Sequence, residues 1–276
     1  MKPSTALTVL LAAAGTALFT PAPTAHAAVT ALEAQRDVKK TQDVKIAHVA
    51  DKPVHVRTDN GSIKLVKKAV PEVVVTFRLR SGTQERLDGV KTHVERATDG
   101  MLKAWVEWPG GKTQSKDACD IEVTIPNANG LDLQTANGEI AADEFSGPAT
   151  LKTSNGAIRV KHHAGAVKAS TSNGEIELEG APAADLSTSN GKITVALNPD
   201  APGPINATTS NGAISASVGE KMNATITCTT SNGKVTIPAG SGTVNKAKTF
   251  GTITLGDGSQ KCAFKTSNGS IRVSKR

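Results

Sequence analysis

The histidine and carboxylate side chains that could carry metal or acid–base chemistry are few and poorly spaced for it. His162 and His163 are adjacent, and adjacent residues of an extended chain point to opposite sides. Because the ligands of a metal ion must converge on one point, two such histidines make a poor metal pair. We interpret them as part of an ordinary surface loop.

A second group of acidic residues alternates along one segment, where Glu175, Glu177 and Glu179 share one face of an extended chain. Each has a basic residue at the matching position of a neighbouring copy of the repeat described below: Lys192 for Glu175, Arg159 for Glu177 and Lys161 for Glu179. Solvated ion pairs of this kind contribute little individually. We expect an ion-pair patch here and not a catalytic acid cluster.

The remaining acidic candidates, Asp143, Glu144 and Asp185, are single residues at predicted corners of the chain. A polysaccharide lyase or hydrolase would need carboxylates gathered in a cleft, with a Ca²⁺ ion or a strong base beside them. We therefore expect no catalytic residue, no cofactor and no metal site. A solenoid polysaccharide lyase or hydrolase is kept as the alternative function.

The elements that would position these residues come from a repeat built on an Asn-Gly pair, typified by Thr-Ser-Asn-Gly-Ala-Ile-Arg-Val over residues 153–160. The glycines of the successive copies, including a degenerate one at Gly251 and an outlying first one at Gly61, are Gly61, Gly138, Gly156, Gly174, Gly191, Gly212, Gly233, Gly251 and Gly269. From Gly138 onward the steps are mostly 18 or 21 residues. A period of this length indicates an array, since one such unit cannot bury its own apolar face.

Alternate residues on both sides of each Asn-Gly pair are apolar, which predicts two short strands in each copy. A tight hairpin at Asn-Gly would set Arg159 opposite Lys152, a repulsive pair. Stacked copies instead set Arg159 beside Glu177. We therefore predict an all-β, single-chain β-solenoid with rungs of about 18 to 21 residues.

Stacking also explains the polar positions of the repeat, because identical asparagine amides one rung apart can bond to each other as a ladder. The ladder residues of the array are Asn137, Asn155, Asn173, Asn190, Asn211, Asn232 and Asn268. We expect the ladder to break at the degenerate Gly251 copy. The glycine after each asparagine is expected to supply the positive φ that a tight corner commonly needs.

The ends of the chain indicate its organisation. Residues 1–27 read as a secretory signal peptide, with Lys2, an apolar run and a small-residue cleavage site. Residues 28–42 are expected to form a flexible leader, 43–126 a first rung plus an antiparallel β cap, and 127–276 the β-solenoid repeats. We expect an exported protein without a membrane span, whose far end is protected by the charge of Lys275 and Arg276.

Three cysteines follow the predicted cleavage site. Cys228 and Cys262 lie on either side of the Gly251 copy, so chain-order stacking places them two rungs, about 9.6 Å, apart, beyond the reach of a disulfide. We expect buried, reduced cysteines, with the state of Cys119 left open.

Aromatic residues are scarce: the chain has two tryptophans, five phenylalanines and no tyrosine. This weakens any proposal of a sugar-binding platform or a stacked-base surface. Residues 28–116 hold 17 Lys and Arg against 11 Asp and Glu, whereas residues 117–276 hold 14 of each. The excess suggests a surface for anionic envelope polymers, surface glycans or extracellular nucleic acid, or else lysines that merely keep a β-rich protein soluble. The residues of that surface would be Lys67, Lys68, Arg78, Arg80 and Lys103.

The repeats, the outlying first copy and the β-rich insertion together resemble the bacterial "putative adhesin" families of β-strand-repeat proteins, over roughly Val44 to Arg276. The resemblance implies a solenoid at the cell envelope with a surface-interaction role and no catalytic residues. An ice-binding solenoid is a second alternative. It is motivated by the outward hydroxyls of Thr194, Ser215, Thr236, Thr252 and Thr254, in an array interrupted by Ala213 and Lys234.

Overall fold

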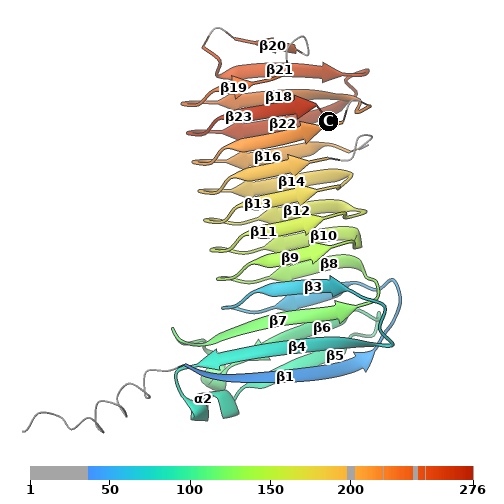
Figure 1. The fold of residues 1–276 in the computed structure, drawn as a ribbon, viewed down its shortest axis with the longest axis vertical. Helices are drawn as coiled ribbons and strands as arrows, with labels where there is room; N and C mark the ends of the chain where they lie inside the picture. The colour runs from blue at the N-terminus through green and yellow to red at the C-terminus, as the bar shows by residue number, and fades with distance from the viewer. Residues whose placement is uncertain (1–36, 198–202, 220, 239–241, 246, 276) are drawn as a thin grey trace, which may run out of the picture. The chain divides into compact units, whose positions relative to one another are not determined.

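The computed structural model describes residues 37–197, 203–219, 221–238, 242–245 and 247–275. The predicted signal peptide, and the predicted leader as far as residue 36, lie outside these residues. Residues 1–36 and 37–276 are two separate units, and everything below concerns the second. Within it, rungs of two short strands stack into an elongated column (Figure 1).

The strands form two sheets that face each other across one core. The first has eleven strands, in the spatial order β1 (Val38–Ala47), β4 (Glu72–Ser81), β7 (Ala118–Ile125), β3 (Ile63–Lys67), β9 (Ile140–Asp143), β11 (Ile158–Lys161), β13 (Ile176–Glu179), β15 (Ile193–Ala196), β17 (Ile214–Val218), β23 (Ile271–Lys275) and β19 (Val235–Thr236).

The second sheet has twelve strands, in the spatial order β20 (Gly242–Val244), β21 (Phe250–Leu255), β18 (Ala224–Thr230), β22 (Gln260–Thr266), β16 (Ile205–Thr209), β14 (Ala183–Thr188), β12 (Ala166–Ser170), β10 (Ser146–Lys152), β8 (Asn129–Gln134), β2 (Val54–Arg57), β6 (Leu102–Glu107) and β5 (Lys91–Arg96). A short helix α2 (Gln84–Asp88) and a 3-10 turn η1 (Pro109–Gly111) join the strands of the N-terminal end.

The strands form where the sequence alternates, and their apolar residues point into the core. The burial of β11 alternates from Ile158 (0% exposed) through Arg159 to Val160 (1%). Equivalent residues of β13 are in parallel register, so that Arg159 is the partner of Glu177. The stacked arrangement is therefore confirmed, and the hairpin is excluded.

The N-terminal end is only partly the antiparallel cap that we predicted. Strand β4 is antiparallel to β1 and β7, and β5 is antiparallel to β6. However, β6 and β7 run parallel to β2 and β3 and form a further rung outside the first copy of the repeat. The outlying copy therefore lies inside the stack and not at its end.

The prediction of a flexible leader over residues 28–42 is wrong for its last part, because Val38 to Gln42 belong to β1. This strand is paired with β4 over its full length. Val38, Val44 and Ile46 pack against the core from it. The backbone groups of the long strand β4 need partners on both sides, and β1 supplies them on the outer side.

The far end does not follow chain order. β22 lies between β16 and β18, and β23 lies between β17 and β19, so the last copy of the repeat is inserted before the copy of Gly233. The degenerate copy instead forms β21, antiparallel to β18. β19 covers only Ile271 and Arg272 of β23, so Lys275 lies beyond the covered part, and its protective role at the far end stays a prediction. Arg276 lies outside the described residues. The copy with the complete Thr-Ser-Asn-Gly corner takes the parallel position, and the copy without it does not.

All three cysteines are buried and free, as predicted for Cys228 and Cys262. The reason given was wrong, since β18 and β22 are direct neighbours and Cys262 is the partner of Ile226. The two thiols are thus offset by two positions along adjacent strands. Burial raises the pKa of Cys119 and of Cys228 to about 12, so these thiols stay protonated at neutral pH.

Within the described residues, no helix combines the length and the apolar character that a membrane crossing requires.

Candidate functional site

The Asn-Gly corners of the rungs form a continuous column of hydrogen-bonded amides. In each rung the asparagine Nδ2 donates to Oδ1 of the asparagine one rung nearer the N-terminal end, over 2.5 to 2.8 Å. In spatial order the ladder among the described residues is Asn60, Asn137, Asn155, Asn173, Asn190, Asn211, Asn268 and Asn232. The break expected at the Gly251 copy does not occur, because that copy is not in the parallel stack.

A second column of hydrogen bonds runs inside the first. In the rungs from Gly138 onward that carry the Asn-Gly corner, the buried threonine three residues before the glycine donates its hydroxyl to a glycine carbonyl in the neighbouring rung. In the first copy, Thr58 donates to the carbonyl of Cys119 instead. Thr171 bonds Gly156 and Thr188 bonds Gly174, each over 3.0 Å. Each corner is therefore tied to its neighbour by both a side-chain amide and a side-chain hydroxyl.

The Asn-Gly corners need glycine for a different reason from the one that we predicted. Among the glycines of the Asn-Gly corners, only Gly61 has a positive φ, 136°. The others are required by close approach: a Cβ on Gly174 would overlap the carbonyl group of Gly156. The same overlap recurs at Gly138, Gly191, Gly212, Gly233 and Gly269. The Asn-Gly corner thus lets adjacent rungs come into backbone contact.

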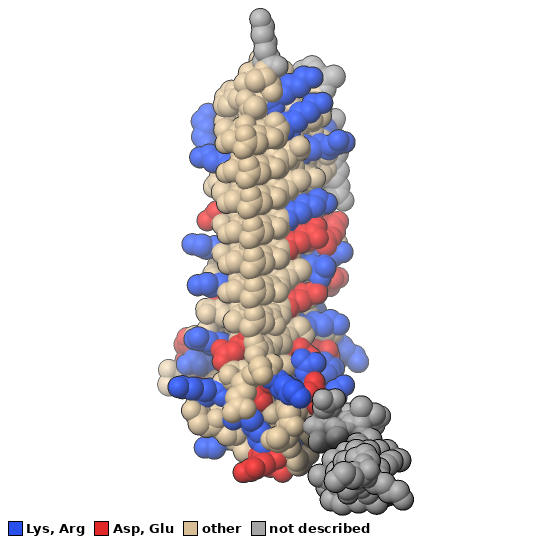
Figure 2. All heavy atoms as spheres, turned by 90° about the vertical axis from the view of Figure 1, so that its left-hand side faces the viewer, with Lys and Arg blue, Asp and Glu red and all other residues tan. Residues whose placement is uncertain are grey.

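Figure 2 shows the face on which the corners lie, where an uncharged column runs along the stack between rows of charged side chains. At its N-terminal end the ladder stops at a main-chain group, because Asn60 Nδ2 donates to the carbonyl oxygen of Asp117 over 3.1 Å.

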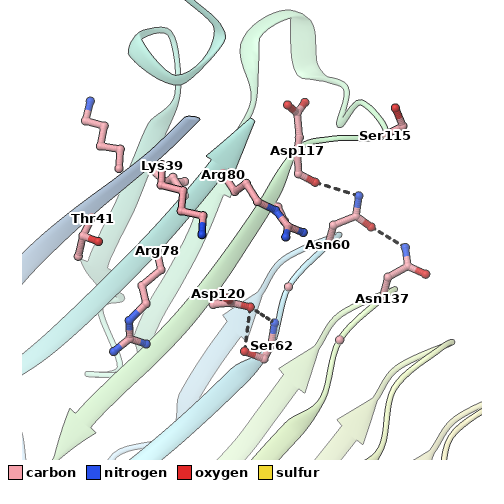
Figure 3. Close-up of a pocket in the computed structure, with 15 residues that line it drawn as sticks. Lys39, Thr41, Asn60, Ser62, Arg78, Arg80, Ser115, Asp117, Asp120 and Asn137 are labelled. Carbon is pink, nitrogen blue, oxygen red and sulfur yellow. Dashed lines mark hydrogen bonds between the residues drawn. The ribbon is translucent and has the colours of Figure 1, made fainter. Parts of the chain in front are cut away.

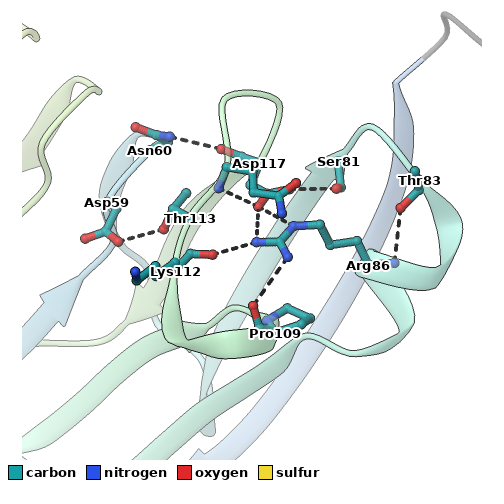
Figure 4. Close-up of polar contacts among 10 residues, drawn as sticks. Asp59, Asn60, Ser81, Thr83, Arg86, Pro109, Lys112, Thr113 and Asp117 are labelled. Carbon is teal, nitrogen blue, oxygen red and sulfur yellow. Dashed lines mark hydrogen bonds and ion pairs between the residues drawn. The ribbon is translucent and has the colours of Figure 1, made fainter.

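Asp117 is the centre of a buried polar network in the cap (Figure 4). Its side chain is 1% exposed and accepts hydrogen bonds from Ser81 Oγ at 2.6 Å, Arg86 Nε at 2.7 Å and the Gln114 amide at 2.8 Å. Burial alone would raise the pKa of Asp117, but these hydrogen bonds and the Arg86 charge outweigh it, and the pKa is lowered. Arg86 also donates to the main chain of Pro109 and Lys112, which joins α2 to the loop before β7.

A basic groove of about 870 Å³ opens beside this network at the foot of the ladder (Figure 3). Its cations come from two paired strands: Lys39 of β1 is the register partner of Arg80 of β4, and Thr41 is the partner of Arg78. Lys39, Arg78 and Arg80 therefore lie on one face of the sheet. Asp120 of β7 is the register partner of Arg78 and lies on this same face. Asn60, Ser62, Asp117 and Asn137 also line the groove.

The five residues of the predicted anionic-ligand surface are not brought together. Arg78 and Arg80 line the basic groove. Lys67 ends β3 and lies 3.6 Å from Glu144, with Lys68 directly after it. Lys103 lies on β6 of the other sheet, 4.0 Å from Glu95. The sequence missed Lys39 and Lys40 because their segment was expected to be a leader.

The two histidines of the corner after β11 differ from each other. His162 is exposed and its Nδ1 lies 2.9 Å from Asp143, which raises the pKa of His162. His163 is 1% exposed, which contradicts the surface-loop interpretation for this residue. Its Nε2 contacts the carbonyl of Gly147 at 2.7 Å, and burial lowers the pKa of His163. The two side chains therefore have different surroundings and partners, although His162, with a φ of 47°, is not in the extended conformation assumed for the prediction.

The expected ion-pair patch is present in part. Arg159 contacts Glu139, which is the main cause of its raised pKa, and its Nε lies 3.6 Å from Glu177. Lys161 Nζ lies 3.9 Å from Glu177. All of these groups are well exposed, so each pair contributes little to stability.

The residues that a lyase or hydrolase, or an ice-binding surface, would need do not lie together. Asp143 contacts His162, Glu144 contacts Lys67, and Asp185 lies in β14 on the other sheet. No cluster of three or more metal-binding side chains occurs in the described parts of the chain. In the proposed ice-binding array, Arg272 of β23 lies between Ser215 and Thr236. The array also divides between the two sheets, since Thr252 and Thr254 belong to β21.

The comparison with protein families agrees with this architecture. The model of the Toastrack DUF4097 family matches residues 43–274. The chain belongs to this family. The match begins within β1 and includes the other strands of the cap and the rungs of this Toastrack chain, whereas Lys39 and Lys40 precede it.

The solved structures that match this Toastrack chain have low sequence identity to it. A "putative adhesin" from Bacteroides fragilis is 16% identical, with 86% of this chain and 97% of that chain covered and a TM-score of 0.42. A "putative lipid binding protein" from Parabacteroides distasonis is 15% identical, with 86% and 96% covered and a TM-score of 0.42. A "putative cell adhesion protein" from Clostridium sporogenes is 11% identical, with 87% and 100% covered and a TM-score of 0.33. No curated protein was found to match the sequence.

Proposed function

We propose that this chain is an exported, non-enzymatic β-solenoid whose basic groove binds an anionic polymer of the cell envelope. The observation that carries the proposal is the row formed by Lys39, Arg78 and Arg80 on one face of the paired strands β1 and β4. Three adjacent cations at the rim of a groove attract a polymer that carries repeated negative charges.

The charges of the groove are not cancelled by its own carboxylates. Asp117 is buried and already paired with Arg86. Asp120 accepts hydrogen bonds from the neutral amide and hydroxyl of Ser62 and keeps its negative charge beside Arg78, its register partner. The four cations of the lining, Lys39, Lys40, Arg78 and Arg80, outnumber this one carboxylate. In the described residues, Lys39 and Lys40 have no ion pair. The groove therefore keeps a positive potential.

The partners of the two arginines are displaceable. Arg78 lies 3.2 Å from Glu122 and Arg80 lies 3.8 Å from Asp37. Both arginine side chains are about half exposed, at 51% and 52%, and exposed ion pairs of this kind are weak. A phosphate, sulfate or carboxylate group of a ligand can replace Glu122 or Asp37 at little cost.

The solenoid gives this groove a rigid support. The ladder ends at Asp117, which also lines the groove, so the array and the binding face share one buried network. Export is supported by the signal peptide expected at residues 1–27. The sequence and the fold together favour a role at the outside of the cell.

The test is retention on immobilised dextran sulfate, with uncharged dextran as the reference matrix. The triple variant Lys39→Glu, Arg78→Glu, Arg80→Glu should elute at much lower salt, because it replaces three attractions by three repulsions. The matched control is Lys234→Glu, Lys265→Glu, Lys275→Glu, which makes the same charge change at exposed positions of the far end. Equal losses in the two triple variants would refute a localised site and leave only a general effect of net charge.

The non-enzymatic part of the proposal has its own test. Of the three His–carboxylate pairs in the described residues, His55 with Asp132, 2.9 Å apart and partly exposed, is the pair to test first because both of its members line one cavity. A screen for polysaccharide hydrolase and lyase activity is expected to show no turnover. Turnover that disappears in His55→Ala but not in His162→Ala would establish the enzymatic alternative.

A further inference from the structure

A second groove lies on the other sheet of the N-terminal end, away from the basic groove. It has a volume of about 580 Å³ and is lined by ten residues of the described chain. These are His55, Arg57, Thr58, Asp59, Glu95, Met101, Lys103, Trp105, Val106 and Asp132. None of them lines the basic groove.

An indole ring forms one wall of this groove. Trp105 projects from the outer face of β6 and is partly exposed, whereas Trp108, the other tryptophan of the protein, is buried at 4%. The ring of Trp105 is held by stacking on the His93 imidazole, with centroids 4.7 Å apart and planes 8° from parallel. Because its orientation is fixed in this way, the indole is a preformed flat surface for a ligand.

The polar groups around this ring balance one another in charge. Lys103 lies 4.0 Å from Glu95, and His55 lies 2.9 Å from Asp132. Arg57 faces the cavity together with Asp59, which accepts a hydrogen bond from Thr113 at 2.7 Å. The wall thus offers both acceptors and donors without a large net charge, which suits an uncharged polyhydroxylated ligand better than an anion.

The groove continues across the strands. A smaller cavity of about 170 Å³ shares Arg57, Thr58 and Asp59 with it and extends to Lys152. Trp105, Arg57, Gln134 and Lys152 are successive register partners on the parallel strands β6, β2, β8 and β10. Three strand spacings amount to about 14 Å, so the groove is long enough for several units of a linear polymer.

We propose that this groove binds an uncharged glycan chain, with one sugar ring stacked on Trp105 and its hydroxyls bonded to Arg57, Asp59 and Asp132. Sugar hydroxyls both donate and accept, so they match a wall of paired carboxylates and cations. A single-stranded nucleic acid fits less well, since it needs successive aromatic platforms and would meet Asp59 and Asp132 with its phosphates. The site is independent of the anionic-polymer site, which lies on the other sheet.

The test is a titration of the purified protein with neutral hexasaccharides of glucose, mannose, galactose and N-acetylglucosamine, followed by tryptophan fluorescence and by calorimetry. Fluorescence is suited to the question because the other indole is buried. At least one hexasaccharide should bind with a Kd below about 1 mM. The affinity should change less than twofold between low and high salt, whereas retention on dextran sulfate falls steeply.

Variants locate the site. Trp105→Ala should weaken binding at least tenfold, and Trp105→Phe should restore part of the loss because it keeps a flat ring. Phe250→Ala removes an aromatic side chain that is 43% exposed on β21 of the same sheet, and it should bind like the unmodified protein. Circular dichroism spectra that are the same for all variants ensure that folding is not what changed.

Two results would overturn the proposal. One is the absence of binding by every hexasaccharide of the panel up to 1 mM, on the order of the weakest useful affinity. The other is Trp105-dependent binding of oligothymidylate in place of the sugars, which would assign the groove to single-stranded nucleic acid. Both results would leave the proposal for the basic groove intact, since dextran sulfate retention depends on other residues.

Discussion

The side-chain amide of Asn60 donates to the main-chain oxygen of Asp117 over 3.1 Å, and this bond joins the asparagine ladder to the buried ion pair of the cap. All amides of the ladder point the same way, each donating towards the N-terminal end. Hydrogen bonds aligned in a chain polarise one another. The carbonyl oxygen of Asp117 thus accepts from the last amide of this directional column.

The ladder should contribute measurably to stability. In Asn173→Ala, two bonds of 2.7 Å are lost, the one donated to Asn155 and the one accepted from Asn190. At roughly 0.5 to 1.5 kcal/mol for each bond, the free energy of unfolding should fall by about 1 to 3 kcal/mol. Urea denaturation followed by circular dichroism measures the change.

The matched control is Ser172→Ala, the exposed neighbour of Asn173 in the same corner. A surface change of this kind is expected to stay within about 0.5 kcal/mol. If both variants lost the same free energy, the amide column would be a consequence of stacking and not a cause of stability.

The corner glycines should be less tolerant than any other position of the repeat. In Gly174→Ala the new methyl group meets the main-chain carbonyl of Gly156, which cannot move without separating two rungs. Overpacking of this kind costs about 1 to 3 kcal/mol or more. Gly82→Ala is the control, because the nearest atom there belongs to the flexible side chain of Lys116. In thermal unfolding, the melting temperature of Gly82→Ala should be close to that of the unmodified protein, and that of Gly174→Ala should be lower. Equal melting temperatures for the two variants would contradict the close-approach explanation.

The Asp117–Arg86 pair should be the most costly single interaction of the cap to break. Asp117→Ala leaves the Arg86 guanidinium buried, at 14% exposure, without its carboxylate, and such losses cost about 3 to 5 kcal/mol. Hydrogen exchange should then increase in α2 and in the loop before β7, which Arg86 joins. A uniform increase over the whole stack would instead indicate that cap and rungs unfold as one unit.

The same pair makes a prediction about pH. Because the pKa of Asp117 is lowered in the folded state, its contribution is fully present above the unfolded value, about 3.9, and is lost as pH falls through the folded value. The difference in unfolding free energy between the unmodified protein and Asp117→Asn should therefore be constant from pH 7 to 5 and shrink below about pH 4. A difference that grows on acidification would contradict a lowered pKa.

The repeating part of the fold was predictable because each position of the repeat has one chemical character. The charges of Arg159, Lys152 and Glu177 were enough to choose stacked rungs over hairpins. The order of the rungs at the two ends was not predictable, because a repeat shows which copies are alike but not which are neighbours. The role of the corner glycines was also missed, since a close approach of two backbones has no signature beyond the glycine itself.

The candidate sites depended on information that the sequence holds only indirectly. Lys39 and Arg80 are far apart in the chain, and only the pairing of β1 with β4 makes them neighbours. The only signal for β1 was that Val38, Val44 and Ile46 fall on one face of an extended chain, and the polar residues Lys40 and Gln42 on that face interrupt it. The count of aromatic residues argued against a sugar platform, but a count does not show that Trp105 stands at the wall of a groove.

The insertion of the last repeat copy before the copy of Gly233 can be tested by engineered disulfides. Thr208 of β16 is in register with Lys265 of β22, which is in register with Thr229 of β18. All three side chains are exposed. Neighbouring strands are about 4.8 Å apart, within the range for a disulfide, whereas Thr208 and Thr229 are two spacings, about 9.6 Å, apart and outside it.

Mild oxidation should therefore form a disulfide in Thr208→Cys, Lys265→Cys and in Thr229→Cys, Lys265→Cys, but not in Thr208→Cys, Thr229→Cys. The native thiols should not interfere, because they are buried and burial raises the pKa of Cys119 and Cys228 to about 12. The mass of the intact protein after thiol alkylation gives the number of free cysteines. Chain-order stacking, with the Gly251 copy as a rung between those of Gly233 and Gly269, would reverse all three results. Thr208 and Thr229 would then be neighbours, and Lys265 would be at least two rungs from either. This outcome would require the far end of both sheets to be redrawn.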